Sequence, residues 1–203
     1  MAEEAKKAEL SIEEVLASTS IADVYQAAKQ LDGVAKKTHL VESPYFSDLC
    51  GNNVYLKPEN LQNTGSFKLR GAYNKISQLN ENERKRGVIT ASAGNHAQGV
   101  AFAARALNCK AVICMPATTP ILKVEATRAY GAEVVLYGDS FDDAYAKSLE
   151  LQKKKGYVYI HPFNDQKVLA GQGTTALEII DELKDVDAIL VPIGGGGFAS
   201  GVA

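Results

Sequence analysis

The amino-acid sequence predicts an α/β protein whose parallel sheet is covered by helices on both faces. Short apolar runs alternate with segments of helical periodicity at least four times along the chain. The apolar runs are continuous and do not alternate with polar residues, which is typical of parallel strands buried on both faces. The 203 residues are 46% apolar, so the chain is large enough to bury a hydrophobic core.

Each expected element rests on a local signal. In the first helix Val24, Ala27 and Leu31 share one face, Ser20 can cap the start, and Gly33 can end it. The later helices repeat this apolar spacing, and Gly, Pro or Ser bounds the strands. The expected helices cover residues 20–31, 69–79, 100–104, 122–130, 140–154 and 174–183. The expected strands cover residues 53–57, 87–90, 111–115, 132–137, 157–160 and 188–193.

Composition excludes several classes of protein. The formal charge is −2 and 23% of the residues are charged, which indicates neither a nucleic-acid partner nor an anionic membrane surface. No apolar run is long enough to cross a bilayer, and residues 1–10 lack the apolar core of a secretory signal, so we expect a frayed tail or short helix there. Cys50, Cys109 and Cys114 form no C-x-x-C pair. Free thiols, buried at Cys109 and Cys114, and a cytoplasmic location are therefore expected, with no metal site.

Ligands of parallel sheets bind at the loops that follow the carboxyl ends of the strands, so the motifs were sought there. The first candidate is Lys68, in the first turn of an expected helix and flanked by Phe67 and Leu69. A desolvated lysine has a lowered pKa and becomes a nucleophile able to form a Schiff base. The alternative for Lys68 alone is a surface lysine on an amphipathic helix.

The second candidate is the loop Ser92, Ala93, Gly94, Asn95 and His96, which follows a strand and opens a helix. Its small residues let backbone N–H groups point outward, which suits an anion such as a carboxylate. Asn95 offers both a hydrogen-bond donor and an acceptor. His96 is either a base or a residue that caps or packs.

The third candidate is the run Gly194, Gly195, Gly196 and Gly197, followed by Phe198, directly after an apolar segment. Glycines forgo side-chain packing, and their usual benefit is close approach of the backbone to a ligand, often a phosphate. The run is neither a P-loop nor a dinucleotide fingerprint, because the required lysine or downstream acidic residue does not follow. A flexible tight turn is the alternative. Together, the three loops specify a lysine, an oxyanion cradle and a phosphate cradle, which match a phosphorylated aldehyde cofactor.

These segments carry a resemblance to a known family. From about residue 40 to 203 the chain resembles the threonine dehydratase (threonine ammonia-lyase) family, within the fold type II pyridoxal-phosphate enzymes. The family-like segments, in the family's order, are GSFKLRGA, SAGNHAQGVAFAA, ATRAYGAEVVLYG, HPFNDQKVLAGQGT and PIGGGG. The resemblance implies two parallel-sheet α/β domains with the cofactor cleft between them. The small domain would cover residues 84–159, and the large domain residues 1–83 and 160–203, without the C-terminal part of its sheet.

The resemblance also implies roles for matching residues. Lys68 would be the Schiff-base lysine and the acid/base at the substrate's α carbon, and Phe67 would pack near the ring of pyridoxal 5′-phosphate. Asn95 would hydrogen-bond the ring's phenolic oxygen. The glycine run and the backbone of Phe198 would hold the phosphate, and the loop from Ser92 to His96 would receive the substrate carboxylate.

The implied reaction is β-elimination from L-threonine or L-serine, which gives 2-oxobutanoate or pyruvate and ammonia. Serine racemases are similar but carry a second serine in the asparagine loop, where this chain has Ala93, which cannot transfer a proton. Two departures stand out. Phe198 occupies a position where leucine is common, and family members continue well past the glycine run.

Three alternatives remain open at this point: a serine racemase-like enzyme, a catalytically incomplete fragment that binds only the cofactor, and a nucleotide-binding module that uses the same glycines. The resemblance further implies a homodimer or homotetramer and a nucleotide or amino-acid effector. It does not rank threonine against serine.

Overall fold

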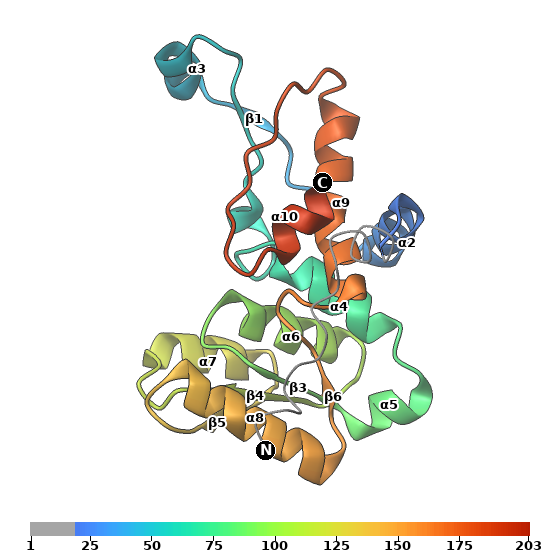
Figure 1. Cartoon of the computed structure of the whole chain (residues 1–203), viewed down its shortest axis with the longest axis vertical. Helices are drawn as coiled ribbons and strands as arrows, with labels where there is room; N and C mark the ends of the chain where they lie inside the picture. Colours follow the sequence, from blue (N-terminus) through green and yellow to red (C-terminus); the bar gives the residue numbers. More distant parts are fainter. Residues whose placement is uncertain (1–18) are drawn as a thin grey trace, which may run out of the picture.

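The structure is a computed structural model that describes residues 19–203. The tail expected over residues 1–10 lies outside the described residues. The polypeptide forms a parallel sheet with helices on both faces, next to a second layer made mostly of helices (Figure 1). Within residues 19–203, no helix combines the length and the apolar character needed to cross a bilayer.

The sheet contains four parallel strands in the order β5-β4-β3-β6. Ile89 of β3 lies opposite Val112 of β4 on one side and Tyr159 of β6 on the other. Every residue of β3 and β4 is buried, as expected for central strands covered on both faces. The strands are β3 (Val88–Ala91), β4 (Ala111–Met115), β5 (Glu133–Leu136) and β6 (Val158–Tyr159). The strands predicted over residues 87–90, 111–115, 132–137 and 157–160 are thus confirmed.

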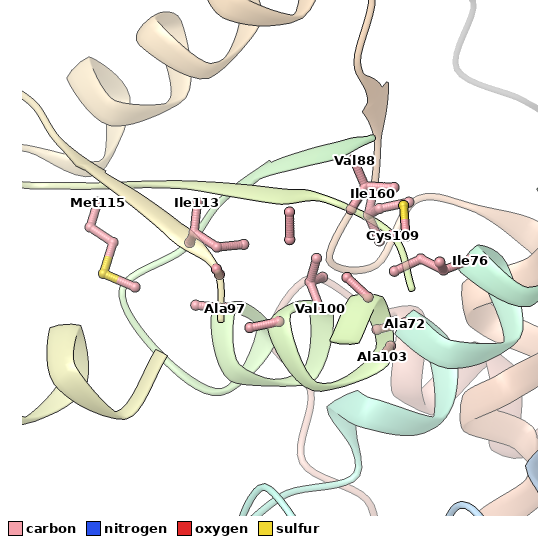
Figure 2. Packing of buried hydrophobic residues seen from close by; sticks show 14 of the residues in the cluster. Ala72, Ile76, Val88, Ala97, Val100, Ala103, Cys109, Ile113, Met115 and Ile160 are labelled. Atoms are coloured by element: carbon pink, nitrogen blue, oxygen red, sulfur yellow. The ribbon is translucent and has the colours of Figure 1, made fainter. Parts of the chain in front are cut away.

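Helices α6 (Asn95–Ala106) and α7 (Ile121–Ala129) cover one face of this sheet, and α8 (Phe141–Lys155) covers the other. Val100 of α6 packs with Ile113 and Met115 of β4 in the larger hydrophobic cluster, seen from close by in Figure 2. Ala144 of α8 belongs to the smaller cluster on the opposite face. The helices predicted in these three segments are confirmed, and the free thiols of Cys109 and Cys114 are buried as predicted, whereas the Cys50 thiol is exposed.

A second layer of helices lies beside α6. Helix α4 packs against both α6 and α9, and α9 in turn contacts α2 and α10 (Figure 1). Ser20 caps α2 in a reciprocal box with Asp23, so the predicted start of that helix is confirmed. The helices of this part are α2 (Ile21–Leu31), α4 (Lys68–Ser77), α9 (Gln166–Glu182) and α10 (Gly197–Val202), and α5 (Glu81–Arg86) leads from α4 into β3.

A short antiparallel pair projects from this layer. We call residues 41–56 the β1–β2 arm; it contains β1 (Val41–Glu42), α3 (Pro44–Cys50) and β2 (Tyr55–Leu56), and the 3-10 turn η1 (Glu59–Leu61) follows it. The strand expected over residues 53–57 is thus reduced to two residues. Both residues of each strand are exposed.

The strand predicted over residues 188–193 is wrong for this structure, because the segment has no regular secondary structure. Leu190 is 92% and Ile193 74% exposed. A strand requires a neighbouring backbone to take up its N–H and C=O groups, and no other strand of the described residues lies beside this segment. The second parallel sheet is therefore not formed within residues 19–203. Helix α9 also begins earlier than expected, at Gln166, since Asp165 accepts hydrogen bonds from the amides of Lys167 and Val168.

Candidate active site

Lys68 is the first residue of α4, and its amine is directed into the interior. Its Nζ donates a hydrogen bond to the carbonyl oxygen of Pro162 at 2.7 Å. Burial lowers the pKa of the Lys68 amine below its ordinary value. The partial positive charge at the start of a helix also disfavours an ammonium ion there. A neutral amine is the nucleophilic form of lysine, so this environment suits attack on a carbonyl group.

Three helices approach one another closely around Lys68 because glycines stand at their crossings. A methyl group on Gly71 of α4 would lie 2.7 Å from the carbonyl oxygen of Val168 in α9. One on Gly171 of α9 would lie 2.6 Å from the Cα of Gly71. A methyl group on Gly99 of α6 would lie 3.0 Å from the backbone carbon of Lys68. Backbone contacts from both sides therefore fix the position of Lys68.

The start of α4 has no side-chain cap of its own, since Phe67 stands at the N-cap position. The side chain of Gln172 in α9 supplies an acceptor, and its Oε1 takes the N–H of Gly71 at 3.2 Å. Gln172 is 1% exposed. The first turn that carries Lys68 is thus capped from a neighbouring helix.

Arg70 anchors the opposite side of the same turn and is 1% exposed. Its Nε and NH2 donate to Glu59 at 2.8 Å each, its NH1 donates to Glu178 at 2.6 Å, and NH1 also reaches Thr174 at 3.1 Å. Lys57 pairs with the second oxygen of Glu178 at 2.6 Å. Burial by itself would raise the pKa of Glu59, but the hydrogen bonds and charge of Arg70 hold it below the usual value. This network ties α4 to α9 and to η1.

The glycine turn, residues 194–197, leads into α10. Gly196 has a φ of +82°, which favours glycine. Methyl groups on Gly195 and Gly197 would overlap Phe163, so the turn packs directly on that residue. A methyl group on Gly194 or Gly196 would meet nothing within 4 Å. One side of the turn is therefore packed and the other is open.

The backbone donors of the glycine turn are free to bind an anion. Among the described residues, no hydrogen bond joins the N–H groups of residues 194–198 to another group of the chain. Consecutive free amides at the start of a helix suit a phosphate. A nucleophilic amine and an anion cradle fit the aldehyde and the phosphate of pyridoxal 5′-phosphate.

The loop after β6 links these parts. Pro162 accepts the hydrogen bond from Lys68, and Phe163 packs on the glycine turn. The ring of Phe67 is stacked on that of Phe198, with centroids 4.0 Å apart and an interplanar angle of 14°. The structure thus connects Lys68, Phe67, Phe198 and the glycine turn through these contacts, and the roles assigned to these residues stay a prediction.

His96 joins the same loop from the start of α6. It is 3% exposed, and its Nε2 lies 3.0 Å from the carbonyl oxygen of Ile160, to which it donates. Burial, assisted by the charges of Lys68 and His161, lowers the pKa of His96 to about 3. His96 is therefore neutral at pH 7, and of the predicted alternatives the geometry favours a packing role that joins α6 to the end of β6.

The rest of the asparagine loop is less tightly engaged. The Ser92 hydroxyl accepts the N–H of Gly94 at 3.3 Å within the loop itself, and Ala93 is half-buried. Asn95 is exposed, and no hydrogen bond joins its side chain to another group of residues 19–203. The loop follows β3 at the carboxyl edge of the sheet, where its amides and the Asn95 side chain are available to a ligand.

Comparison with known proteins places the chain. A family model described as "Pyridoxal-phosphate dependent enzyme" matches residues 31–203. The chain belongs to this family. It is 53% identical over 184 residues to an L-threonine ammonia-lyase of Thermotoga maritima, and the alignment covers 91% of this chain and 46% of that relative. It thus spans about half the length of such relatives.

Solved structures agree with this family assignment. Processed threonine deaminase isoform 2 from Solanum lycopersicum superposes with a TM-score of 0.88 at 48% identity, covering 95% of this chain and 52% of that one. Maize serine racemase gives a TM-score of 0.89 at 35% identity, covering 92% and 56%. The fold type II architecture expected from the sequence is confirmed by these two structures.

The sequence did not predict several residues of this site. The family-like segments contain Arg70, Gln172 and Phe163, but the sequence predicted no role for them. An arginine between apolar neighbours signals a buried ion pair, and a helix containing Gly171 signals close packing. Pro162 follows a strand at its carboxyl end, the same signal that located the other loops.

A cavity of about 510 Å³ lies away from these residues, at the opposite edge of the sheet. Helices α6 and α7 end there, so their carbonyl groups carry partial negative charge. Arg105 and Arg128 stand in the last turns of these helices and balance that charge. The cavity therefore lacks the free backbone amides and the lysine of the candidate site, although it is large.

Proposed function

We propose that the protein uses pyridoxal 5′-phosphate to deaminate L-threonine, and also L-serine, by β-elimination. The observation that carries the proposal is the half-buried Lys68 amine, of lowered pKa, joined through Pro162 and Phe163 to a turn of free backbone amides. The relatives at about half identity are named as threonine ammonia-lyases, which supports threonine as the substrate. The products are 2-oxobutanoate from threonine or pyruvate from serine, with ammonia.

The residues divide the work between binding and proton transfer. Lys68 holds the cofactor's aldehyde end, the glycine turn with the amide of Phe198 holds the phosphate, and Phe67 packs near the ring. Asn95 binds the ring's phenolic oxygen, and the loop from Ser92 to His96 receives the substrate carboxylate. When bound, the cofactor supplies an electron sink for negative charge at the substrate's α carbon.

Lys68 would be freed when the substrate's amino group takes its place at the aldehyde carbon, and it would then act as the general base. Its neutral amine takes the α proton of the amino acid, and the β hydroxyl leaves with a proton as water. The lowered pKa favours this step because more of the amine is unprotonated at neutral pH. The released unsaturated amine takes up water and yields the oxo acid and ammonia, so the water lost is regained.

The racemase alternative needs a second acid on the opposite face of the substrate. Ala93 occupies the matching position and has no proton to give. We therefore expect no D-serine from L-serine. Chiral chromatography of the reaction mixture checks this expectation, and steady formation of D-serine at a rate comparable to pyruvate would favour the racemase.

The decisive experiment measures cofactor attachment and turnover separately. Borohydride reduction of the loaded protein, followed by peptide mass analysis, should place the cofactor on Lys68. Formation of 2-oxobutanoate from L-threonine should be lost by at least about a thousandfold in Lys68→Ala. Attachment without turnover would favour a fragment that binds only the cofactor. Full deaminase activity in Lys68→Ala would refute the proposal.

We also propose a cytoplasmic location and a homodimer or homotetramer. Free, buried thiols at Cys109 and Cys114 support a reducing compartment. A nucleotide or amino acid remains the proposed class of effector. Light scattering of the purified protein tests the assembly, and titration with nucleotide in the absence of pyridoxal 5′-phosphate tests whether the glycine turn prefers a nucleotide.

A further inference from the structure

One side-chain contact joins the two ends of the candidate site directly. Phe67 immediately precedes Lys68, and Phe198 immediately follows the glycine turn. Their rings lie nearly parallel, with centroids 4.0 Å apart and 14° between the planes. Both residues are half-buried. The amine and the anion cradle are thus connected through a stacked aromatic pair.

The glycine turn depends on such contacts because its N–H groups donate no hydrogen bond within the described residues, and Gly196 is held only through its carbonyl, which accepts the N–H of Ser200 at 2.9 Å. On one side Gly195 and Gly197 pack on Phe163. Helix α10 is held on α9 by close approach of Gly201 to Leu169 and Gly173. Pro162, which precedes Phe163, accepts the hydrogen bond from Lys68, so the loop after β6 provides one link between the amine and the turn. The Phe67–Phe198 stack provides a second link, and it is formed by the residues directly next to each group.

We propose that Phe198 is a positioning residue: its ring, stacked on Phe67, holds the free amides of the glycine turn in register with the Lys68 amine. A single ligand with an aldehyde at one end and a phosphate at the other can then engage both groups at once. The proposal rests on the proposed function, and it gives a role to the ring of Phe198, of which only the backbone was assigned above.

The chemistry of the stack explains why the ring matters. Two stacked rings restrict each other's rotation, whereas a leucine at position 198 would contact Phe67 without fixing its plane. Aromatic pairing beyond area burial corresponds to roughly a two- to tenfold change in affinity. The change should fall on ligands that bridge the two ends of the site, because a ligand that touches only Lys68 does not use the turn.

The test compares pyridoxal 5′-phosphate with pyridoxal, which has the aldehyde but no phosphate. Dissociation constants for both are measured by absorbance titration of the full chain. In Phe198→Leu we expect pyridoxal 5′-phosphate to bind roughly two- to tenfold more weakly, with pyridoxal unchanged. Phe67→Leu should weaken both aldehydes, because Phe67 packs near the ring that they share. In the Phe67→Leu background, Phe198→Leu should change the ratio of the two constants little, since the stack is already broken.

Two variants serve as controls. Phe198→Tyr keeps the ring and should keep the wild-type ratio of the two constants. Phe46→Leu removes an exposed ring that pairs only with its neighbour Tyr45 on α3, and it should change neither constant. An unchanged ratio in Phe198→Leu, or a loss in Phe198→Tyr as large as in Phe198→Leu, would overturn the positioning role.

The failure of the proposed function gives a different result. In that case wild-type protein would form no borohydride-stable link at Lys68 with either aldehyde. If only the positioning role of Phe198 is wrong, the link at Lys68 still forms. In that case Phe198→Leu leaves the ratio of the two dissociation constants as it is in the wild type. Equal weakening of both aldehydes in Phe198→Leu would show a general structural role and would also overturn the proposal.

Discussion

The four-stranded sheet and the β1–β2 arm both contain apolar strand residues, but only the central strands of the sheet, β3 and β4, are fully buried. All five residues of β4 are buried, whereas both residues of β1 and both of β2 are exposed. Helices cover the sheet on two faces, and no helix of the described residues covers the arm. The comparison teaches that an apolar run becomes a core strand only where other elements cover it (Figure 1).

The Arg70 network fixes the arm to the layer of helices. Glu59 lies just beyond the arm, and Thr38, which donates to Glu59 at 2.6 Å, lies just before it. Arg70 of α4 donates to Glu59 directly, and Thr38 is held through Glu59. The chain that enters and leaves the exposed arm is thus fixed to the packed layer by charge pairing.

Arg70→Met should give the largest loss of stability. It leaves the buried Glu59 without its charged partner and Glu178 with Lys57 alone, and breaking a buried ion pair typically costs about 3–5 kcal/mol. Urea denaturation at pH 7 measures the change in the free energy of unfolding. Arg105→Met, in which an exposed arginine is replaced, should change it by no more than about 0.5 kcal/mol and serves as the control.

The same variant has a pH signature. The lowered pKa of Glu59 contributes stability that is present above the ordinary glutamate pKa and is lost as pH falls through the folded-state value. The difference between wild type and Arg70→Met should therefore be full at pH 7 and shrink in acid. A gap that is independent of pH from neutral to acid would contradict the role of Glu59.

Two alanine substitutions, Ile113→Ala and Leu190→Ala, compare a buried with an exposed apolar side chain. Ile113 is 0% exposed in β4, so its truncation should cost about 2–5 kcal/mol. Leu190 is 92% exposed, so its truncation should cost no more than about 0.5 kcal/mol. Thermal or urea unfolding of both variants provides the measurement, and equal losses would show that the segment around Leu190 is buried in solution.

Gly171→Ala should cost about 1–3 kcal/mol, because the added methyl group has no room between α9 and α4. Gly194→Ala is the matched control for stability, since a methyl group there meets nothing within 4 Å. Unfolding in urea compares the two. A neutral Gly171→Ala would mean that the helices separate without loss and that the packed layer is less rigid than the structure indicates.

Lys68→Met should give the smallest effect and the opposite sign. Removing a buried amine whose burial opposes the charge should stabilise the ligand-free protein by about 1 kcal/mol. The folded state binds fewer protons at Lys68 than the unfolded state does, so wild-type stability rises with pH up to the ordinary lysine pKa. The advantage of the variant should accordingly fade as the pH rises from 7 towards the ordinary lysine pKa of about 10.4. Melting temperatures across this range test it.

The sequence predicted the sheet well because Val88–Ala91 and Ala111–Met115 are continuous apolar runs bounded by turn residues. It also located Lys68 and the glycine turn, since both stand beside clear start signals. The error over residues 188–193 arose because strand formation depends on a neighbouring backbone, which no local pattern reports. The early start of α9 was missed because Gly171 and Gly173 lower helix propensity, while tertiary packing overrides it.

Side-chain partners were harder to predict than positions. Arg70 and Gln172 are separated by about a hundred residues, and their contacts follow from how α4 crosses α9. The stack of Phe67 on Phe198 likewise requires the complete fold. Sequence pattern therefore indicates which residues carry chemistry, whereas the network that holds them becomes visible only in three dimensions.

The glycine crossings at Gly71, Gly99 and Gly171 bring main chain against main chain around the reactive lysine. Contacts of this kind leave no room for a side chain of any type. A designer who wishes to change which amino acid is accepted should accordingly keep these three glycines and place the substitutions elsewhere.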